Sequence, residues 1–171
     1  MAMQYDVKSA HLNSSGYFVK YRTRVKGISF TGTATAGYVT LFDTASTPVS
    51  SSVTYAQSGN TVTVTKVAHG LTTGTVIGIH FLSNVSGVSA TDGTYTITRT
   101  GADTFTLTDI NSRTITSTAA VYAVGNWILT YEAAANDTFS NAPIIPGEGI
   151  LAQLGVYGEM SNMDSVQIYY G

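Results

Sequence analysis

The sequence contains no cysteine, few charged residues and no long apolar run. The absence of cysteine excludes disulfide bonds, thiolate zinc sites and a cysteine nucleophile. No apolar run approaches the roughly 18 residues of a membrane-spanning helix. The N-terminal residues also lack the order of charged and then apolar residues that marks a signal peptide. A soluble protein without a cleaved leader is therefore expected.

Charge is scarce in this chain. Charged side chains make up 11% of the 171 residues, against about 25% in an average soluble domain. The formal net charge is -2, so no global field attracts nucleic acid or an anionic membrane, and neither is expected as a partner. Hydroxyl groups must cover the polar faces. Because a hydroxyl costs less to desolvate than an ion, this composition suits packing against other protein, although a secreted β protein with a Thr-rich face would share it.

Period-two alternation of Val, Ile, Thr, Tyr and Phe runs through most of the chain, which predicts an all-β protein. The segment 131–137 is about two helical turns long and ends in Asn-Asp, so it is interpreted as a loop, with a single helical turn as the alternative. The expected strands are 16–26, 27–31, 38–42, 61–67, 76–82, 94–98, 104–108, 127–131, 150–157 and 165–170.

Two breaks divide the chain. A Ser/Pro-rich segment covers residues 46–52, and a second break lies around 119–126. The prediction is a discontinuous docking domain of residues 1–49 plus 125–171, folded as a small β-sandwich or jelly roll and interrupted by a small β-barrel of residues 50–124. The outer segments hold five Lys/Arg and seven Asp/Glu, whereas the middle segment holds three of each.

The middle segment resembles a β-barrel insert found repeatedly in bacteriophage virion proteins, with the pattern HGL-x-x-G, DGTY and TF. The residues that carry this resemblance are Val67-Ala68-His69-Gly70-Leu71-Thr72-Thr73-Gly74, Asp92-Gly93-Thr94-Tyr95-Thr96-Ile97 and Asp103-Thr104-Phe105-Thr106-Leu107. The resemblance implies a structural module without a catalytic residue.

The flanks resemble a small virion protein of marine, podovirus-like phages. The matching segments are Gly27-Ile28-Ser29-Phe30-Thr31-Gly32-Thr33-Ala34-Thr35-Ala36-Gly37-Tyr38-Val39, Ile145-Pro146-Gly147-Glu148-Gly149-Ile150-Leu151, Gly155-Val156-Tyr157 and Ser165-Val166-Gln167-Ile168-Tyr169-Tyr170-Gly171. This second resemblance implies a capsid-surface or tail-associated component that acts through oligomeric contacts.

No motif for catalysis, a cofactor or a metal is found. The three histidines, His11, His69 and His80, have no metal-ligand spacing with a carboxylate. His69 precedes Gly70-Leu71 and is interpreted as a turn residue whose ring caps backbone groups, while alternation directs His80 away from the apolar face of its strand. Serine elbows, paired carboxylates and phosphate-binding glycine loops are also missing. A non-enzymatic protein without a cofactor is expected.

One charge cluster stands out. Lys20, Arg22, Arg24 and Lys26 alternate along residues 20–26 and hold half of the positive charge. On a regular strand all four would project from one face, either as a docking stripe for an acidic partner, or less readily for nucleic acid, or as a solvated face that discourages edge pairing.

Tyr169 and Tyr170 are further candidates for protein docking. Tyrosine suits interfaces where one end of the ring packs against protein and the other end contacts water. One of the two is expected to point inward with Val166 and Ile168; the inward one is expected to be Tyr170.

These features together predict a virion structural protein, specifically a capsid decoration or cement protein located on the capsid surface. Its expected partners are the major capsid protein or other virion proteins and copies of itself, with a trimer as the natural closed form. The alternatives are a tail- or fibre-associated virion protein and a carbohydrate-binding adhesin module.

Overall fold

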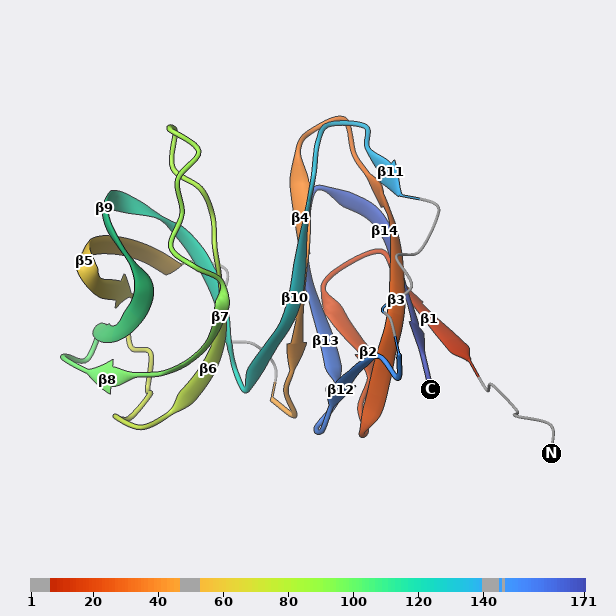
Figure 1. Cartoon of the computed structure of the whole chain (residues 1–171), viewed down its shortest axis with the longest axis horizontal. Coiled ribbons are helices and arrows are strands. Elements are labelled where there is room, and N and C mark those ends of the chain that lie inside the picture. Colours follow the sequence, from red (N-terminus) through yellow and green to blue (C-terminus); the bar gives the residue numbers. More distant parts are fainter. Residues whose placement is uncertain (1–6, 47–52, 140–144, 146) are drawn as a thin grey trace. The chain divides into compact units, whose positions relative to one another are not determined.

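The computed structural model describes residues 7–46, 53–139, 145 and 147–171, and these residues form antiparallel strands (Figure 1). The chain is all-β, as expected. It divides into two compact units, one of Met1–Ala45 with Ile128–Gly171 and one of Ser46–Trp127, named here the split unit and the inserted unit. The sequence-based division placed the two junctions at 49/50 and 124/125. In the part of the chain described here, no helix is long and apolar enough to cross a membrane.

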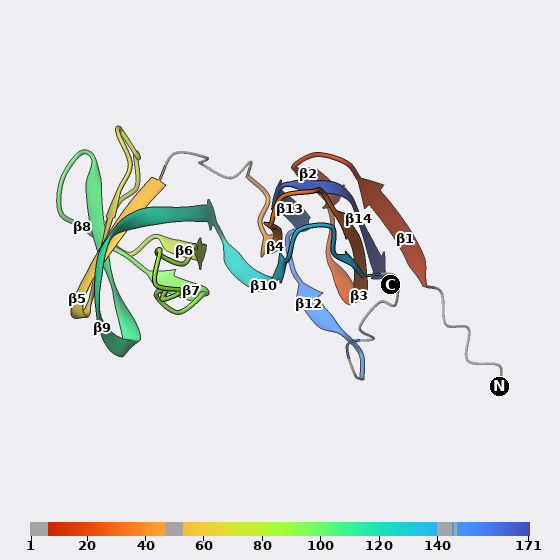
Figure 2. The ribbon, with the colours of Figure 1, turned by 90° about the horizontal axis from the view of Figure 1, so that it is seen from above.

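The split unit is a sandwich of two sheets, which Figures 1 and 2 show face to face. The first sheet has the order β1-β14-β3-β11, with β12 also paired to β3, and the second has the order β10-β4-β13-β2. The strands are β1 (Lys8–Leu12), β2 (Gly16–Val19), β3 (Thr23–Gly32), β4 (Gly37–Asp43), β10 (Asn126–Ala133), β11 (Thr138–Phe139), β12 (Ile150–Ala152), β13 (Val156–Ser161) and β14 (Met163–Tyr170).

Alternation explains the core of this sandwich. Ile28 of β3 pairs with Ile168 of β14, and both are fully buried. Val39 and Leu41 of β4 enter the same cluster from the second sheet. Burying each such aliphatic side chain contributes about 1.5–3 kcal/mol, so the period-two pattern is the main source of stability here.

The expected strand over residues 16–26 is wrong, because the chain changes sheets within it. β2 pairs with β13 of the second sheet, while β3 pairs with β14 of the first, and residues 20–22 form the bend between them. The alternation of cations with Tyr21 and Thr23 continues through the bend and mimics a regular strand. The separate strand expected at 27–31 is also wrong, since β3 continues without a break through Gly27.

The expected strand over residues 150–157 is likewise two strands, β12 and β13. A turn at residues 153–155 separates them, and the buried carboxylate of Asp43 holds this turn. Asp43 accepts hydrogen bonds from the backbone N–H groups of Gln153 at 2.9 Å, Leu154 at 2.7 Å and Gly155 at 3.3 Å. Because the carboxylate accepts from three successive backbone donors, the turn is fixed by a residue 110 positions or more away in sequence.

The inserted unit is built on two long paired strands. Its elements are β5 (Val53–Thr65), β6 (Val76–Phe81), β7 (Gly93–Thr96), β8 (Thr98–Arg99) and β9 (Thr104–Val124). β9 extends well beyond the expected strand at 104–108 and pairs with β5 along most of its length. Val62, Val64, Phe105 and Leu107 point into the core, as the alternation predicts.

The pairings of the inserted unit close into a ring. β6 pairs with the C-terminal end of β9 and with β7, while β8, which follows β7 after Ile97, pairs with the N-terminal end of β9. For both ends of one strand to join the same ring, β9 must bend. Its register with β5 shifts between Gly59 and Thr61, where β9 carries extra residues. The inserted unit is therefore a small barrel with a bulged corner.

Candidate docking site

The four cations of residues 20–26 do not share one strand face. Arg24 and Lys26 belong to β3, whereas Lys20 and Arg22 lie in the bend that precedes it. The expected four-residue stripe is therefore wrong, for the same reason that the long strand was wrong. What remains of it is a pair of cations at the start of β3.

Lys20 and Arg22 have local partners. The Lys20 ammonium lies 5.1 Å from the centre of the Tyr17 ring, and Arg22 Nε donates to the side-chain oxygen of Gln153 at 3.0 Å. Both cations are exposed. Such exposed contacts contribute about 1 kcal/mol or less each, so neither residue is strongly fixed.

Lys26 is the extra residue of a β-bulge. Tyr169 of β14 pairs with Gly27 and Tyr170 pairs with Val25, which leaves no residue of β14 opposite Lys26. A bulge bends the strand and changes the direction of the side chain that it carries. The position of the Lys26 ammonium is therefore set by the mismatch between two strands and not by simple alternation.

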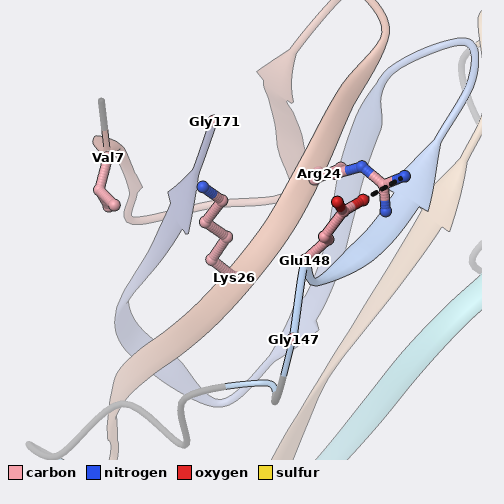
Figure 3. Close-up of a pocket in the computed structure, with 6 residues that line it drawn as sticks. All are labelled: Val7, Arg24, Lys26, Gly147, Glu148 and Gly171. Atoms are coloured by element: carbon pink, nitrogen blue, oxygen red, sulfur yellow. Dashed lines mark ion pairs between the residues drawn. The ribbon is translucent and has the colours of Figure 1, made fainter. Parts of the chain in front are cut away.

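A backbone hydrogen bond also holds this bulge from the edge of β3 that faces away from β14. Its carbonyl oxygen accepts a hydrogen bond from the Ile145 backbone N–H at 2.9 Å. The Lys26 side chain extends toward the side on which Val7 and Gly171 lie (Figure 3). Among the described residues, none forms an ion pair with Lys26.

Arg24 is held by a tight turn of residues 147–149. Its guanidinium pairs with Glu148, with 3.1 Å between Nη2 and Oε2, and Nη1 donates to the Gly149 carbonyl at 3.3 Å. Gly149 has a φ of +82°, and a Cβ at this position would overlap the carbonyl oxygen of Val25. The turn can lie against β3 because the residue after Glu148 is glycine.

These residues enclose an open pocket of about 470 Å³. Its charged side chains are those of Arg24, Lys26 and Glu148, and Figure 3 shows Arg24 and Glu148 turned toward each other while Lys26 stands apart. The Glu148 side chain is 82% exposed, so this carboxylate rests on the rim and does not fill the pocket. The lining residues are Val7, Arg24, Lys26, Gly147, Glu148 and Gly171.

The two tyrosines point to opposite sides of β14. Tyr170 packs against the core together with Val166 and Ile168, which confirms the expected inward set. A side-chain hydrogen bond with Tyr21 raises the pKa of Tyr170, and burial raises it further. Tyr169 lies on the other face, opposite Gly27 of β3. Tyr170 thus contributes to the sandwich core, while Tyr169 is the one presented on the outer side of the sheet.

The inserted unit confirms the interpretation of His69. Its Nδ1 accepts a hydrogen bond from the Leu71 backbone N–H at 3.0 Å, and its Nε2 lies 3.2 Å from the Gly101 carbonyl oxygen. The ring is buried and meets Phe105 edge to face. His69 therefore caps backbone groups on two separate turns.

His80 has a partner that the sequence did not reveal. Its Nδ1 lies 2.7 Å from the Asp92 carboxylate, whose other oxygen accepts the Phe81 backbone N–H at 2.8 Å. His80 is fully buried. The third histidine, His11, is exposed on β1.

Asp109 is the centre of a polar network at the bulged corner of the barrel, which the sequence analysis also missed. Its fully buried carboxylate accepts from the backbone N–H groups of Thr91 and Asn111, both at 3.1 Å, and from Gln57 Nε2 at 3.3 Å. Arg113 approaches to 3.5 Å. Burial opposes ionisation, but these hydrogen bonds and the Arg113 charge outweigh it and lower the pKa of Asp109.

Within residues 7–46, 53–139, 145 and 147–171, no group of three or more His, Asp or Glu side chains is arranged to hold a metal ion. The carboxylates of Asp43, Asp92 and Asp109 are instead directed at hydrogen-bond donors of the protein itself. These three residues have structural roles.

No family model matches the sequence, and no curated protein or solved structure matches it. The functional assignment rests on the chain's own residues.

Proposed function

We propose that the chain is a non-enzymatic virion structural protein that decorates a bacteriophage capsid and binds the shell through protein–protein contacts of its split unit. The pocket at Arg24 and Lys26, together with the outer side of the sheet that carries Tyr169, supplies the candidate contact surface. Protein partners suit this surface better than nucleic acid, because Glu148 lies at its rim beside the two cations.

The observation that carries the proposal is the convergence of the phage-like flank segments on one strand. In β3, Phe30 pairs with Val166 of β14, and Val25 pairs with Ile150 of β12. Each of these pairs joins residues more than 120 positions apart in sequence, yet the three strands form one sheet. The segments on which the proposed resemblance rests therefore belong to one folded unit.

The place of the insertion supports the same proposal. The chain leaves the split unit after β4 and returns in β10, and these two strands are neighbours in one sheet. Thr130 of β10 donates from its hydroxyl to the hydroxyl of Thr40 in β4 at 2.9 Å. Because the entry and exit strands are adjacent, a docking unit can carry a second unit without losing its own sheet.

The proposed partners are the major capsid protein and further copies of this chain, with a closed trimer as the expected oligomer. Sparse charge favours such contacts, because fewer ions must be desolvated when the surfaces meet.

Co-expression with the major capsid protein encoded in the same genome tests the proposal. We expect the chain to sediment with assembled shells, and cryo-electron microscopy of virions to show density repeated over the capsid. Light scattering of the purified chain should give three times its monomer mass. Density confined to the tail, or a chain that remains unbound beside assembled shells, would overturn the capsid assignment.

A further inference from the structure

We infer that the outer face of the first sheet, around Tyr169 and Gln167, forms the centre of the contact with the shell and meets an uncharged surface of the partner protein. This inference rests on the proposed attachment to a protein shell and names the chemistry of that contact. Hydrogen bonds and packing on the Tyr169 ring, and not ion pairs, would then hold the two proteins together.

Three neighbouring strands build this face. β1, β14 and β3 lie side by side in the first sheet (Figures 1 and 2). Ala10, Val166 and Ile168 pack in the sandwich core, so the residues that alternate with them point away from it. The strand register arranges the outward residues in two rows, Ser9-Tyr169-Gly27 and His11-Gln167-Ser29.

The polar side chains of the two rows keep their hydrogen-bonding capacity. Among the described residues, none forms a hydrogen bond or an ion pair with the side chain of Ser9, His11, Ser29, Gln167 or Tyr169. Ser9 and His11 are exposed, and the other three are half-buried. Tyrosine supplies rigid contact area at a low entropic cost, while small polar side chains supply adaptable hydrogen bonds. The face is therefore equipped for contact with polar, uncharged groups.

Charge is missing from both rows, which contain no Lys, Arg, Asp or Glu. Lys8 and Asp164 lie beyond the rows, near the starts of β1 and β14. The neighbouring pocket holds charges of both signs, and its Arg24 is already paired with Glu148. A charged partner surface would lose hydration on these rows without gaining a counter-charge. Depletion of charge around tyrosine is also typical of the core of a protein interface.

Co-sedimentation of the full chain with assembled shells, at about 0.05 M and about 0.5 M sodium chloride, tests this inference. We expect the dissociation constant to change less than about twofold with salt, because screening weakens ion pairs and not neutral contacts. Tyr169→Ala should weaken binding about thirtyfold, the size of an interface hot spot. Tyr169→Phe should retain most of the affinity because it keeps the ring. Gln167→Ala should weaken binding about fivefold through loss of a neutral hydrogen bond.

Tyr21→Ala is the matched control, because Tyr21 is 55% exposed but lies in the bend, outside the two rows. Its affinity for shells should equal that of the unsubstituted chain. Amide spectra show whether each variant is folded, and Gln167→Ala decides the matter if Tyr169→Ala is not.

Folded Tyr169→Ala and Gln167→Ala chains that bind shells like the unsubstituted chain would overturn this inference and leave the proposed decoration function standing. Loss of binding at the higher salt concentration would overturn it in favour of an ionic contact. Release of the bound chain by dextran, a neutral polysaccharide, would overturn it in favour of a sugar site. An unsubstituted chain that does not bind shells would instead reject the function itself.

Discussion

The carboxylate of Asp43 accepts a 2.7 Å hydrogen bond from the backbone N–H of Leu154, and so joins the end of β4 to the turn between β12 and β13. Replacing Asp43 with alanine removes the acceptor of three N–H groups of this turn, of which the N–H of Gly155 is buried. We expect a loss of about 2–4 kcal/mol in the free energy of unfolding, measured by urea denaturation. Asp164→Ala, at an exposed position of β14, should change the stability by less than about 0.5 kcal/mol; equal losses would contradict the role of Asp43.

The buried carboxylate of Asp109 should make the stability of the barrel sensitive to acid. Its lowered pKa means that the folded state holds the ionised form more tightly than the unfolded state, whose pKa is 3.8. The resulting stability is present above that value and is lost as the pH falls through the lower, folded-state pKa. We expect unfolding free energies measured between pH 6 and about pH 2 to fall more steeply in the unsubstituted chain than in Asp109→Asn. Parallel pH profiles for the two chains would rule out this coupling.

At neutral pH the same Asp109→Asn substitution should cost about 3 kcal/mol, because the new amide donor would face the Thr91 and Asn111 N–H groups. Asp103→Asn provides the comparison in the same unit. Asp103 is exposed and accepts one backbone hydrogen bond, from Ala68 at 2.7 Å, so a cost of about 1 kcal/mol is expected there. Thermal melts followed by circular dichroism would rank the two variants.

Gly37 leaves no room for a side chain where β4 pairs with β13. A Cβ at this position would overlap the carbonyl oxygen of Ser161 and approach the Asn162 carbonyl oxygen to 2.9 Å, and both are backbone atoms that cannot rotate away. Gly37→Ala should destabilise the split unit by about 2–3 kcal/mol. Gly70→Ala meets no atom within 4 Å but has a φ of +67°, so it should cost about 1 kcal/mol. Chemical denaturation of both variants checks this order.

Deletion of residues 46–127, with a short Gly/Ser linker in their place, should leave the split unit folded. The reason is that β4 and β10 remain neighbours, and none of the described residues between 46 and 127 belongs to the sandwich core. A dispersed amide spectrum and a cooperative melt are the expected results. An aggregated or molten product would show that the sandwich depends on the inserted unit.

Local alternation was sufficient to predict which side of the short runs in the inserted unit is buried. Val62 and Val64 are fully buried while Thr61, Thr63 and Thr65 are exposed, because each short period-two run decides its own faces. The turn role of His69 was also predictable, since its hydrogen-bond partner Leu71 lies two residues away.

Several of the features that sequence reasoning missed depend on partners far along the chain. The break between β2 and β3 arises because their pairing strands belong to different sheets, and nothing in residues 16–26 records this. The Lys26 bulge is set by its register with β14, and Arg24 meets Glu148 only after the sandwich has formed. Half of the predicted docking stripe was lost in this way, and the pocket that replaced it could not be foreseen.

Because β4 and β10 are adjacent, the inserted unit between them could be exchanged for another domain. Neighbouring strands lie about 5 Å apart, so any folded domain whose own ends are similarly close can be spliced between Ala45 and Ile128 with short linkers. The split unit thereby becomes a carrier for displaying foreign domains, independent of what the natural insert does.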